Sequence, residues 1–311
     1  MTTTTDWRTL GDLASFARIE IQAGDIEPWA AVLAQLHAAG VLGFEGTAWA
    51  VKAYNAYDDF GSAFRLVSRW PGPGEWPLCS MDSADAALWP CGTERRNLRG
   101  GLVRKHLDSY VAALGSRSQR DWLAWGIGAD DPGEAFDGLM AYLRRSCWGT
   151  GRQAAFEWAE FAGKALGAPV RAGHGCLWES SGPRQSLERI YNAGERARSQ
   201  EQLDGWAAEC RADLATAGAD LEWWDLETVI CDFNVMRKGR YYPGKHLAMI
   251  TEEIDGLPEP WRSDLAAALL AVIPRPWSDI GPGVAKNLET AYARTGKITT
   301  PFGVSEEGIR A

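Results

Sequence analysis

Apolar residues recur along most of the chain with the spacing of an α-helix. In 10–24 and 27–40 they fall at positions i, i+3 and i+4, and each segment ends at a glycine. The same period continues through 47–70. Alternation of apolar and polar residues, which would indicate a half-buried strand, is scarce, and no long run of β-branched residues occurs. The pattern therefore predicts a mostly α, almost all-α, fold.

Glycine, proline and charged residues divide the rest of the chain into further helices and loops. Helices are expected at 102–114, 121–128, 130–146, after the Gly-rich turn as far as Gly167, and at 200–217, 221–236, 245–256 and 259–273. Loops are expected at 71–101 and 171–187, and the tail from 296 is expected to be loose. We expect a helical region at 1–120, a core at 121–295 and the tail at 296–311.

Composition excludes several classes of protein. The chain has 311 residues, and no stretch approaches the roughly eighteen consecutive apolar residues that a membrane span needs. Its start lacks the basic and apolar regions of a secretory signal, so we expect a cytosolic protein with no membrane partner. The six cysteines form no C-x-x-C pair and there are only four histidines, which favours reduced thiols and no metal site.

Charge is unevenly distributed along the sequence. The net charge is −9, which argues against a protein that coats nucleic acid nonspecifically. Residues 234–246 nevertheless contain four cations and no acid. This segregation suggests a local anion-binding site. The sixteen tryptophans are expected to serve mainly in packing, with a minority available to stack on bases.

Four segments contain residue patterns that could carry chemistry. In 93–107, Arg95, Arg96, Arg99 and Arg104 could touch a nucleic-acid backbone or form a solvated face. The first of the other three is "WGTGRQAAFEWAE" at 148–160. A Gly-x-Gly turn before a helix lets backbone N–H groups face a phosphate, and the helix dipole favours an anion there. Arg152 would add a bidentate cation. The alternative is a simple helix start in which two glycines give steric room.

The second segment is "HGCLWESSGPRQSLERIY" at 174–191. Ser180, Ser181, the amides around Gly182 and Arg184 form a cluster suited to phosphate or pyrophosphate at a helix start. The alternative is a serine N-cap followed by proline. His174 is a candidate acid or base, although a single loop histidine is more often a hydrogen-bonded bystander.

The third segment, "LETVICDFNVMRKGRYYPGKH" at 226–246, combines acids with a cationic turn. Helical spacing places Glu227 near Cys231 and Asn234, while Thr228 and Asp232 share another face. A carboxylate there could deprotonate a nucleophile while the cations neutralise a leaving anion. Tyr241 and Tyr242 could bond a phosphate or stack on a base. The alternative is a helix end whose cations complement the dipole.

Together these three segments resemble the bacteriophage amino acid:DNA transferase family, a branch of the α-glutamyl/putrescinyl thymine pyrophosphorylases. The resemblance rests on "GTGRQAAFEWAE", "SSGPRQSL" and "LETVICDFNVMRKGRYYPGKH", in that order, and is loose elsewhere. It implies a fold like the helix-hairpin-helix DNA glycosylases with an additional N-terminal helical region. It also implies replacement of the pyrophosphate on a modified thymine in DNA by the amine of an amino acid, commonly glycine.

The resemblance also implies roles for particular residues. The diphosphate or the DNA backbone would be held by Arg152, Ser180, Ser181, Arg184, Lys238, Arg240 and Tyr241. The cationic turn itself adds Arg237 and Lys245 as candidates, and the basic loops at 152, 184 and 240 are expected to converge around one hollow. The amine would be bound or deprotonated by Glu157, Glu160, Glu227 or Asp232.

The expected partners are double-stranded DNA containing pyrophosphorylated hydroxymethyluracil and an amino acid, in the cytoplasm of an infected bacterial host. No cofactor is demanded by the sequence, although Mg²⁺ could assist the leaving group. Two alternatives stay open: a helix-hairpin-helix DNA glycosylase, in which Asp232 activates water, and a non-catalytic all-α DNA-binding or adaptor module. The acidic balance weighs against the last of these.

Overall fold

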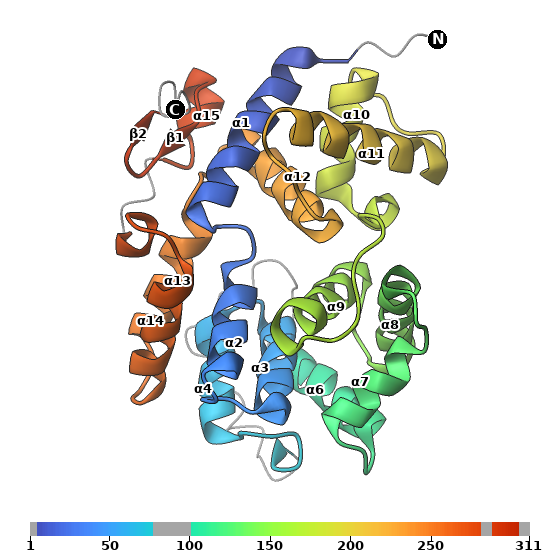
Figure 1. The fold of residues 1–311 in the computed structure, drawn as a ribbon, viewed down its shortest axis with the longest axis vertical. Coiled ribbons are helices and arrows are strands. Elements are labelled where there is room, and N and C mark those ends of the chain that lie inside the picture. The colour runs from blue at the N-terminus through green and yellow to red at the C-terminus, as the bar shows by residue number, and fades with distance from the viewer. Residues whose placement is uncertain (1–4, 77–100, 281–287, 305–311) are drawn as a thin grey trace. The chain divides into compact units, whose positions relative to one another are not determined.

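A computed structural model describes residues 5–76, 101–280 and 288–304. The elements in Figure 1 are α1 (Trp7–Ala23), α2 (Pro28–Ala38), α3 (Phe44–Tyr57), α4 (Phe60–Arg69), α6 (Gly101–Leu114), α7 (Gln119–Ile127), α8 (Pro132–Ser146), α9 (Arg152–Leu166), η2 (Leu177–Glu179), α10 (Ser181–Asn192), α11 (Gln200–Thr216), α12 (Trp223–Arg237), α13 (Lys245–Asp255), α14 (Trp261–Val272), η3 (Trp277–Asp279), α15 (Ala291–Thr295), β1 (Thr299–Thr300) and β2 (Gly303–Val304).

The predicted mostly α fold is confirmed. Two predictions of local structure need correction. The loop expected at 171–187 ends early, because α10 already begins at Ser181, where Pro183 in the first turn needs no N–H partner. The tail expected to be loose from 296 contains the antiparallel pair β1 and β2. Within the described residues, no helix is both long enough and apolar enough to cross a bilayer.

The described chain divides into two compact units, each built from separate stretches of sequence. The first unit contains 1–28, 174–251 and 273–311, and the second contains 29–173 and 252–272. These units do not coincide with the ranges 1–120 and 121–295 expected from the sequence. The reason is visible in the connectivity: α1, at one end of the chain, packs on α10, α11 and α12, far away in sequence.

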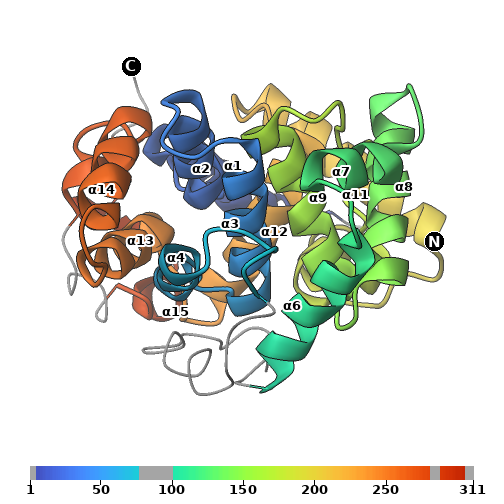
Figure 2. The same cartoon turned by 90° about the horizontal axis from the view of Figure 1, so that it is seen from below.

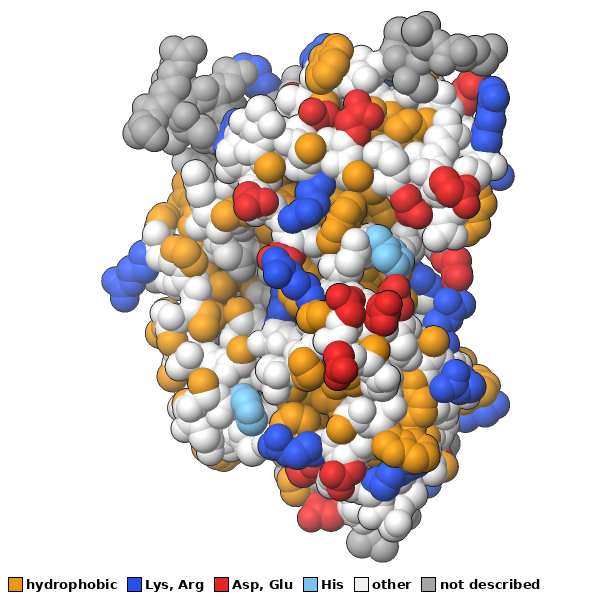
Figure 3. Space-filling view, turned by 45° about the vertical axis from the view of Figure 1, so that its right-hand side comes forward, with side chains coloured by type: hydrophobic (Ala, Val, Ile, Leu, Met, Phe, Trp, Pro, Cys, Tyr) orange, Lys and Arg blue, Asp and Glu red, His pale blue; other side chains and the backbone are white. Residues whose placement is uncertain are grey.

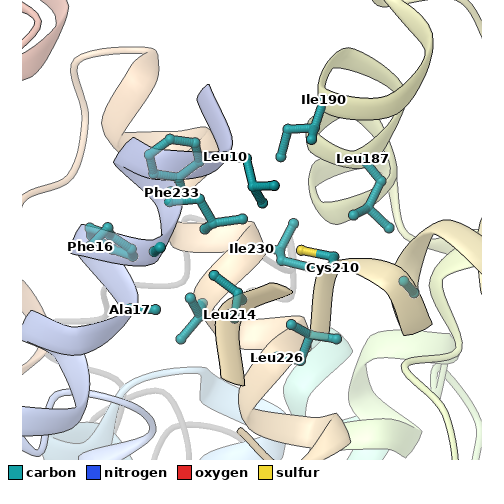
Figure 4. Close-up of a cluster of buried hydrophobic side chains, with 14 of the residues drawn as sticks. Leu10, Phe16, Ala17, Leu187, Ile190, Cys210, Leu214, Leu226, Ile230 and Phe233 are labelled. Carbon is teal, nitrogen blue, oxygen red and sulfur yellow. The ribbon is translucent and has the colours of Figure 1, made fainter. Parts of the chain in front are cut away.

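The core of the first unit lies where four helices meet. Leu10 and Phe16 of α1, Ile190 of α10, Leu214 of α11 and Ile230 of α12 are all at most 5% exposed. Figure 4 shows these side chains pointing toward one another. Burying each large apolar side chain contributes roughly 1.5–3 kcal/mol. This core fixes α10 beside α12, which is the pairing that builds the candidate site in this unit.

The second unit is a group of helices that pack on α3 and α9. α3 contacts α4, α6, α7 and α9, and α8 contacts α7 and α9. Figure 2 shows α6, α7, α8 and α9 gathered together. Aromatic rings fill its interior: Trp122 packs against Tyr110 and Trp158 with ring centroids 5.2 and 6.0 Å apart. These contacts agree with the expectation that most tryptophans serve in packing.

An acid cluster is buried inside the first unit. It consists of Glu20, Asp25, Asp232, Tyr241 and His246, each no more than 3% exposed. The Tyr241 hydroxyl donates to Asp25 Oδ2 at 2.9 Å and lies 3.2 Å from Glu20 Oε2. His246 Nδ1 lies 3.8 Å from Asp232 Oδ2. The cluster therefore joins α1, α12 and the segment that follows α12.

Asp25 holds the backbone of that following segment in place. Its carboxylate accepts the N–H of Gly244 at 2.7 Å and that of Leu247 at 2.9 Å. Burial raises the pKa of Asp25 to about 7, although its hydrogen bonds oppose the shift. Burial, with the nearby carboxylates of Asp25 and Asp232, also raises the pKa of Glu20 well above its usual value.

The raised pKa of Asp25 makes stability fall as pH rises. The unfolded chain releases this proton near 3.8 and the folded protein near 7, so the folded state binds the extra proton between these values. The free energy of unfolding should therefore decrease from pH 4 to 7, by at most about 1.4 kcal/mol per pH unit for this group. Urea unfolding at several pH values measures how the free energy of unfolding changes with pH. Asp25→Asn should make this change smaller, whereas the exposed control Asp220→Asn should not. An unchanged pH dependence in Asp25→Asn would contradict the assignment.

Candidate functional site

A hollow of about 820 Å³ lies beside the turn between α8 and α9, within the second unit. We call it the α8–α9 hollow; Arg144, Arg145 and the Gly149–Gly151 backbone line it. Gly149 has φ +76°, a left-handed conformation that only glycine adopts readily. Gly151 is the N-cap of α9 and offers no side chain to cap the first-turn N–H groups, and it lines the hollow together with Arg144 and Arg145. The Gly-x-Gly turn therefore has the form expected of an anion site.

A buried basic pair supports this turn from the interior. Lys52 and His106 are both fully buried, and Lys52 Nζ lies 2.7 Å from His106 Nε2. His106 Nδ1 in turn lies 2.8 Å from the carbonyl oxygen of Trp148. If Lys52 donates to Nε2, Nδ1 carries the proton and donates to that carbonyl. A cation and an oriented imidazole thus fix the backbone that precedes Gly149.

The other predicted residues of this segment lie on buried faces of α9. Arg152 is 7% exposed and its guanidinium lies 4.5 Å from the centre of the Phe156 ring. Glu157 accepts a hydrogen bond from Asn55 at 3.2 Å. Glu160 pairs with Lys164 at 2.6 Å. The sequence predicted a Gly-x-Gly turn before a helix but did not single out Arg144 and Arg145, although two arginines shortly before a Gly-rich turn are a visible signal.

The first unit contains a second candidate surface, the α10–α12 face, where these two helices approach closely. A Cβ atom on Gly182 would lie 3.2 Å from Cys231 Sγ and 3.7 Å from Asn234 Nδ2. Hydrogen bonds join the two helices at two further points. The Ser180 hydroxyl donates to Glu227 at 3.2 Å, and Lys238 Nζ donates to Gln185 at 3.1 Å. The predicted common face of Glu227, Cys231 and Asn234 therefore lies against α10.

The start of α10 leaves backbone donors available. Ser180 occupies the N-cap position but makes no side-chain cap, because its hydroxyl bonds Glu227 instead. The alternative of an ordinary serine cap is thus not what the structure contains. Arg184, in the first turn, donates to the Trp178 carbonyl at 3.1 Å. The Ser180 hydroxyl, the first-turn N–H groups and the Arg184 guanidinium therefore lie at the same end of α10, where Glu227 contacts Ser180.

The segment after α12 divides into exposed cations and buried tyrosines. Arg240 and Lys238 are exposed, whereas Lys245 pairs with Glu289 at 2.7 Å. Tyr241 and Tyr242 are 2% and 1% exposed, contrary to the expectation that they reach a phosphate or a base. Tyr241 belongs to the buried acid cluster, and Asp232 lies in the same cluster. Among the predicted acids, only Glu227 is partly exposed.

The remaining predictions divide by where the structure places them. His174 Nδ1 accepts the N–H of Cys176 at 3.2 Å, as expected for a hydrogen-bonded loop histidine. Arg152 lies in the second unit whereas Arg184 and Arg240 lie in the first, so their convergence around one hollow stays a prediction. The arginines of 95–99 lie outside the described residues. Figure 3 shows cations and acids interspersed over the visible face, consistent with local rather than extended positive sites.

Comparison with known proteins identifies the family. No curated protein matches the chain. A sequence profile of the amino acid:DNA transferase family matches residues 33–242. The match covers more than half of the chain and includes the Gly-x-Gly turn, the start of α10 and the whole of α12. The resemblance expected from the sequence is confirmed: this chain belongs to the amino acid:DNA transferase family.

Proposed function

We propose that the protein replaces the pyrophosphate of 5-pyrophosphoryloxymethyl-deoxyuridine in DNA with the amine of an amino acid, glycine being the first candidate, in the thymidine hypermodification of a phage. The nitrogen attacks the exocyclic methylene carbon as the carbon–oxygen bond breaks. The electron pair of that bond leaves with pyrophosphate, and the ammonium proton passes to a carboxylate. The family match carries this proposal, because the family name joins an amino acid to DNA.

The start of α10 supports the leaving-group part of this proposal. The Ser180 and Ser181 hydroxyls, first-turn amides and Arg184 are the donors that diphosphate oxygens accept, and the dipole of α10 favours an anion at this end. Arg240 is exposed and forms no ion pair with any acid among the described residues. Donors fixed before the reaction stabilise developing charge more than mobile water does.

Glu227 is the acid best placed to accept the proton. It is partly exposed on the α10–α12 face and touches the Ser180 hydroxyl, whereas Asp232 is committed to the buried acid cluster. In the second unit, Glu157 and Glu160 are buried on α9 and bonded to Asn55 and Lys164. A general base must reach the proton that it removes, and exposure at the site favours Glu227.

The α8–α9 hollow is assigned to the DNA backbone. Half or more of protein–DNA hydrogen bonds go to phosphate and sugar, and helix N-termini and arginines are typical donors. The hollow combines Arg144, Arg145 and the N-terminus of α9. A thymine derivative is then flipped out of the duplex for reaction, since its exocyclic carbon is poorly accessible within the stack.

The function is tested by mass spectrometry of nucleosides. The protein is mixed with duplex DNA carrying the pyrophosphorylated base and a panel of amino acids, with and without Mg²⁺. An amine-linked nucleoside together with released pyrophosphate supports the transferase. Abasic sites would show a glycosylase, and DNA binding without product would show a non-catalytic module.

In this assay Glu227→Gln should lose about 10²–10⁴-fold in turnover, because the amide cannot accept the proton. The helix should persist, since glutamine keeps the size of the side chain and a hydrogen-bond acceptor for Ser180. Glu209→Gln, at an exposed position of α11, is the matched control. Full turnover by Glu227→Gln with an unchanged melting temperature would remove Glu227 from the mechanism.

Gly151→Val should weaken binding to unmodified duplex DNA without unfolding the protein. A Cβ at Gly151 meets nothing within 4 Å, and its φ of −79° suits valine, so only a ligand approaching the turn would be excluded. Gly43→Val is the control, because Gly43 is the N-cap of α3 with φ −68° and equally open surroundings. Fluorescence anisotropy measures the affinity for DNA. An equal loss of affinity in both variants, or no loss in either, would contradict the assignment.

A further inference from the structure

A separate hollow of about 750 Å³ lies in the first unit where α10 and α12 end. We call it the Arg189–Arg237 hollow, and the charged side chains that line it are those of Asp6, Glu188, Arg189, Arg237 and Lys238. Arg189 and Arg237 each lie in the last turn of their helix. Complementing the helix dipole explains either cation alone, but not why both line one hollow.

The two acids of this hollow already have partners. Asp6 caps α1, accepting the backbone N–H of Thr9 at 3.1 Å and its hydroxyl at 2.7 Å, and these bonds lower the pKa of Asp6. Glu188 accepts the N–H of Ala197 at 3.0 Å and lies 3.7 Å from the Arg184 guanidinium. Both acids are thus engaged in contacts of the fold, although Arg189 also contributes to the lowered pKa of Asp6 and Asp6 acts on Arg237 from a distance.

The arginines themselves lack a close counter-ion. Among residues that the structure describes, neither Arg189 nor Arg237 forms an ion pair with an acid within 4.0 Å. Partial burial of Arg237 lowers its pKa, and the positive charge of Arg189 lowers it further. Two guanidinium groups that line one hollow without an ion pair to a described acid disfavour each other, and a bound anion would reverse that repulsion.

We propose that the Arg189–Arg237 hollow binds a phosphodiester group of the DNA backbone. This rests on the proposed function, because it takes DNA as the substrate. Arginine presents two parallel N–H donors to phosphate, and Lys238 adds a third cation beside Gln185. The hollow is separate from the start of α10, since nine residues of helix from Ser180 to Arg189 span roughly 13 Å. Arg237 and Lys238 therefore position DNA rather than hold the departing diphosphate.

Binding of an unmodified duplex tests this proposal without any chemistry. In Arg189→Gln/Arg237→Gln, the dissociation constant should rise about tenfold or more, as expected for lost charge-assisted hydrogen bonds. The slope of log K against log salt concentration should become shallower by roughly 1, since fewer counter-ions are released. Arg189→Glu, at an exposed position, provides a second variant that should weaken binding without disturbing the interior.

The control variant has the same net charge as Arg189→Gln/Arg237→Gln. Arg120→Gln/Arg294→Gln removes two exposed arginines outside the hollow and should leave affinity and salt slope unchanged. Equal losses in both double variants would show a nonspecific charge effect and overturn the proposal. Calorimetry with sodium pyrophosphate distinguishes the other phosphate source: if the hollow variants lose pyrophosphate binding but keep DNA binding, the hollow holds the product instead.

The outcome can be separated from the fate of the proposed function. Turnover by the wild-type protein on pyrophosphorylated DNA tests the transferase chemistry, whereas the hollow is tested by affinity for DNA that cannot react. Absence of turnover with hollow-dependent binding would overturn the chemistry alone. Wild-type affinity in folded Arg189→Gln/Arg237→Gln and Arg189→Glu would overturn the hollow alone.

Discussion

The candidate site of the first unit depends on the close approach of α10 to α12 at Gly182. A Cβ atom at Gly182 would lie 3.2 Å from Cys231 Sγ, which is tighter than an ordinary contact, so a larger side chain there would displace one of the two helices. This contact sets the register in which Ser180 meets Glu227 and Gln185 meets Lys238. The shared core of α1, α10, α11 and α12 also holds this pair of helices together. The packing of α10 on α12 and the arrangement of the candidate site residues thus depend on the same helix–helix contact.

Contacts within the fold also determine which charged side chains of this acidic protein have partners. Acids near the cationic surfaces are engaged by the fold: Asp6 caps a helix, Glu188 accepts a loop N–H and Asp25 anchors the segment after α12. Exposed arginines near them are left without an ion pair, Arg189 and Arg240 among the described residues. A net charge of −9 discourages nonspecific binding of polyanions, and a few local cations can still select a phosphate.

The sequence predicted the helices and the order of the motifs well, because helical periodicity and glycine turns are local signals. It also placed Glu227, Cys231 and Asn234 on one face, which helical geometry alone decides. It could not foresee the burial of Tyr241 or Asp232, since both are covered by Glu20 and its neighbours on α1, some 200 residues away. The proximity of Arg189 to Arg237 could not be predicted for the same reason, because only the pairing of α10 with α12 brings the two residues to one hollow.

The most direct measurement is the rate of amine transfer in a double-mutant cycle at the α10–α12 contact. Gly182→Val should push α10 away from Cys231 and lower transfer by about a hundredfold, since small displacements of aligned groups are costly. Adding Cys231→Ala should restore part of that rate by making room, giving a coupling between the two positions. Wild-type transfer by Gly182→Val, or strictly additive losses in the double variant, would contradict the claim that this contact builds the site.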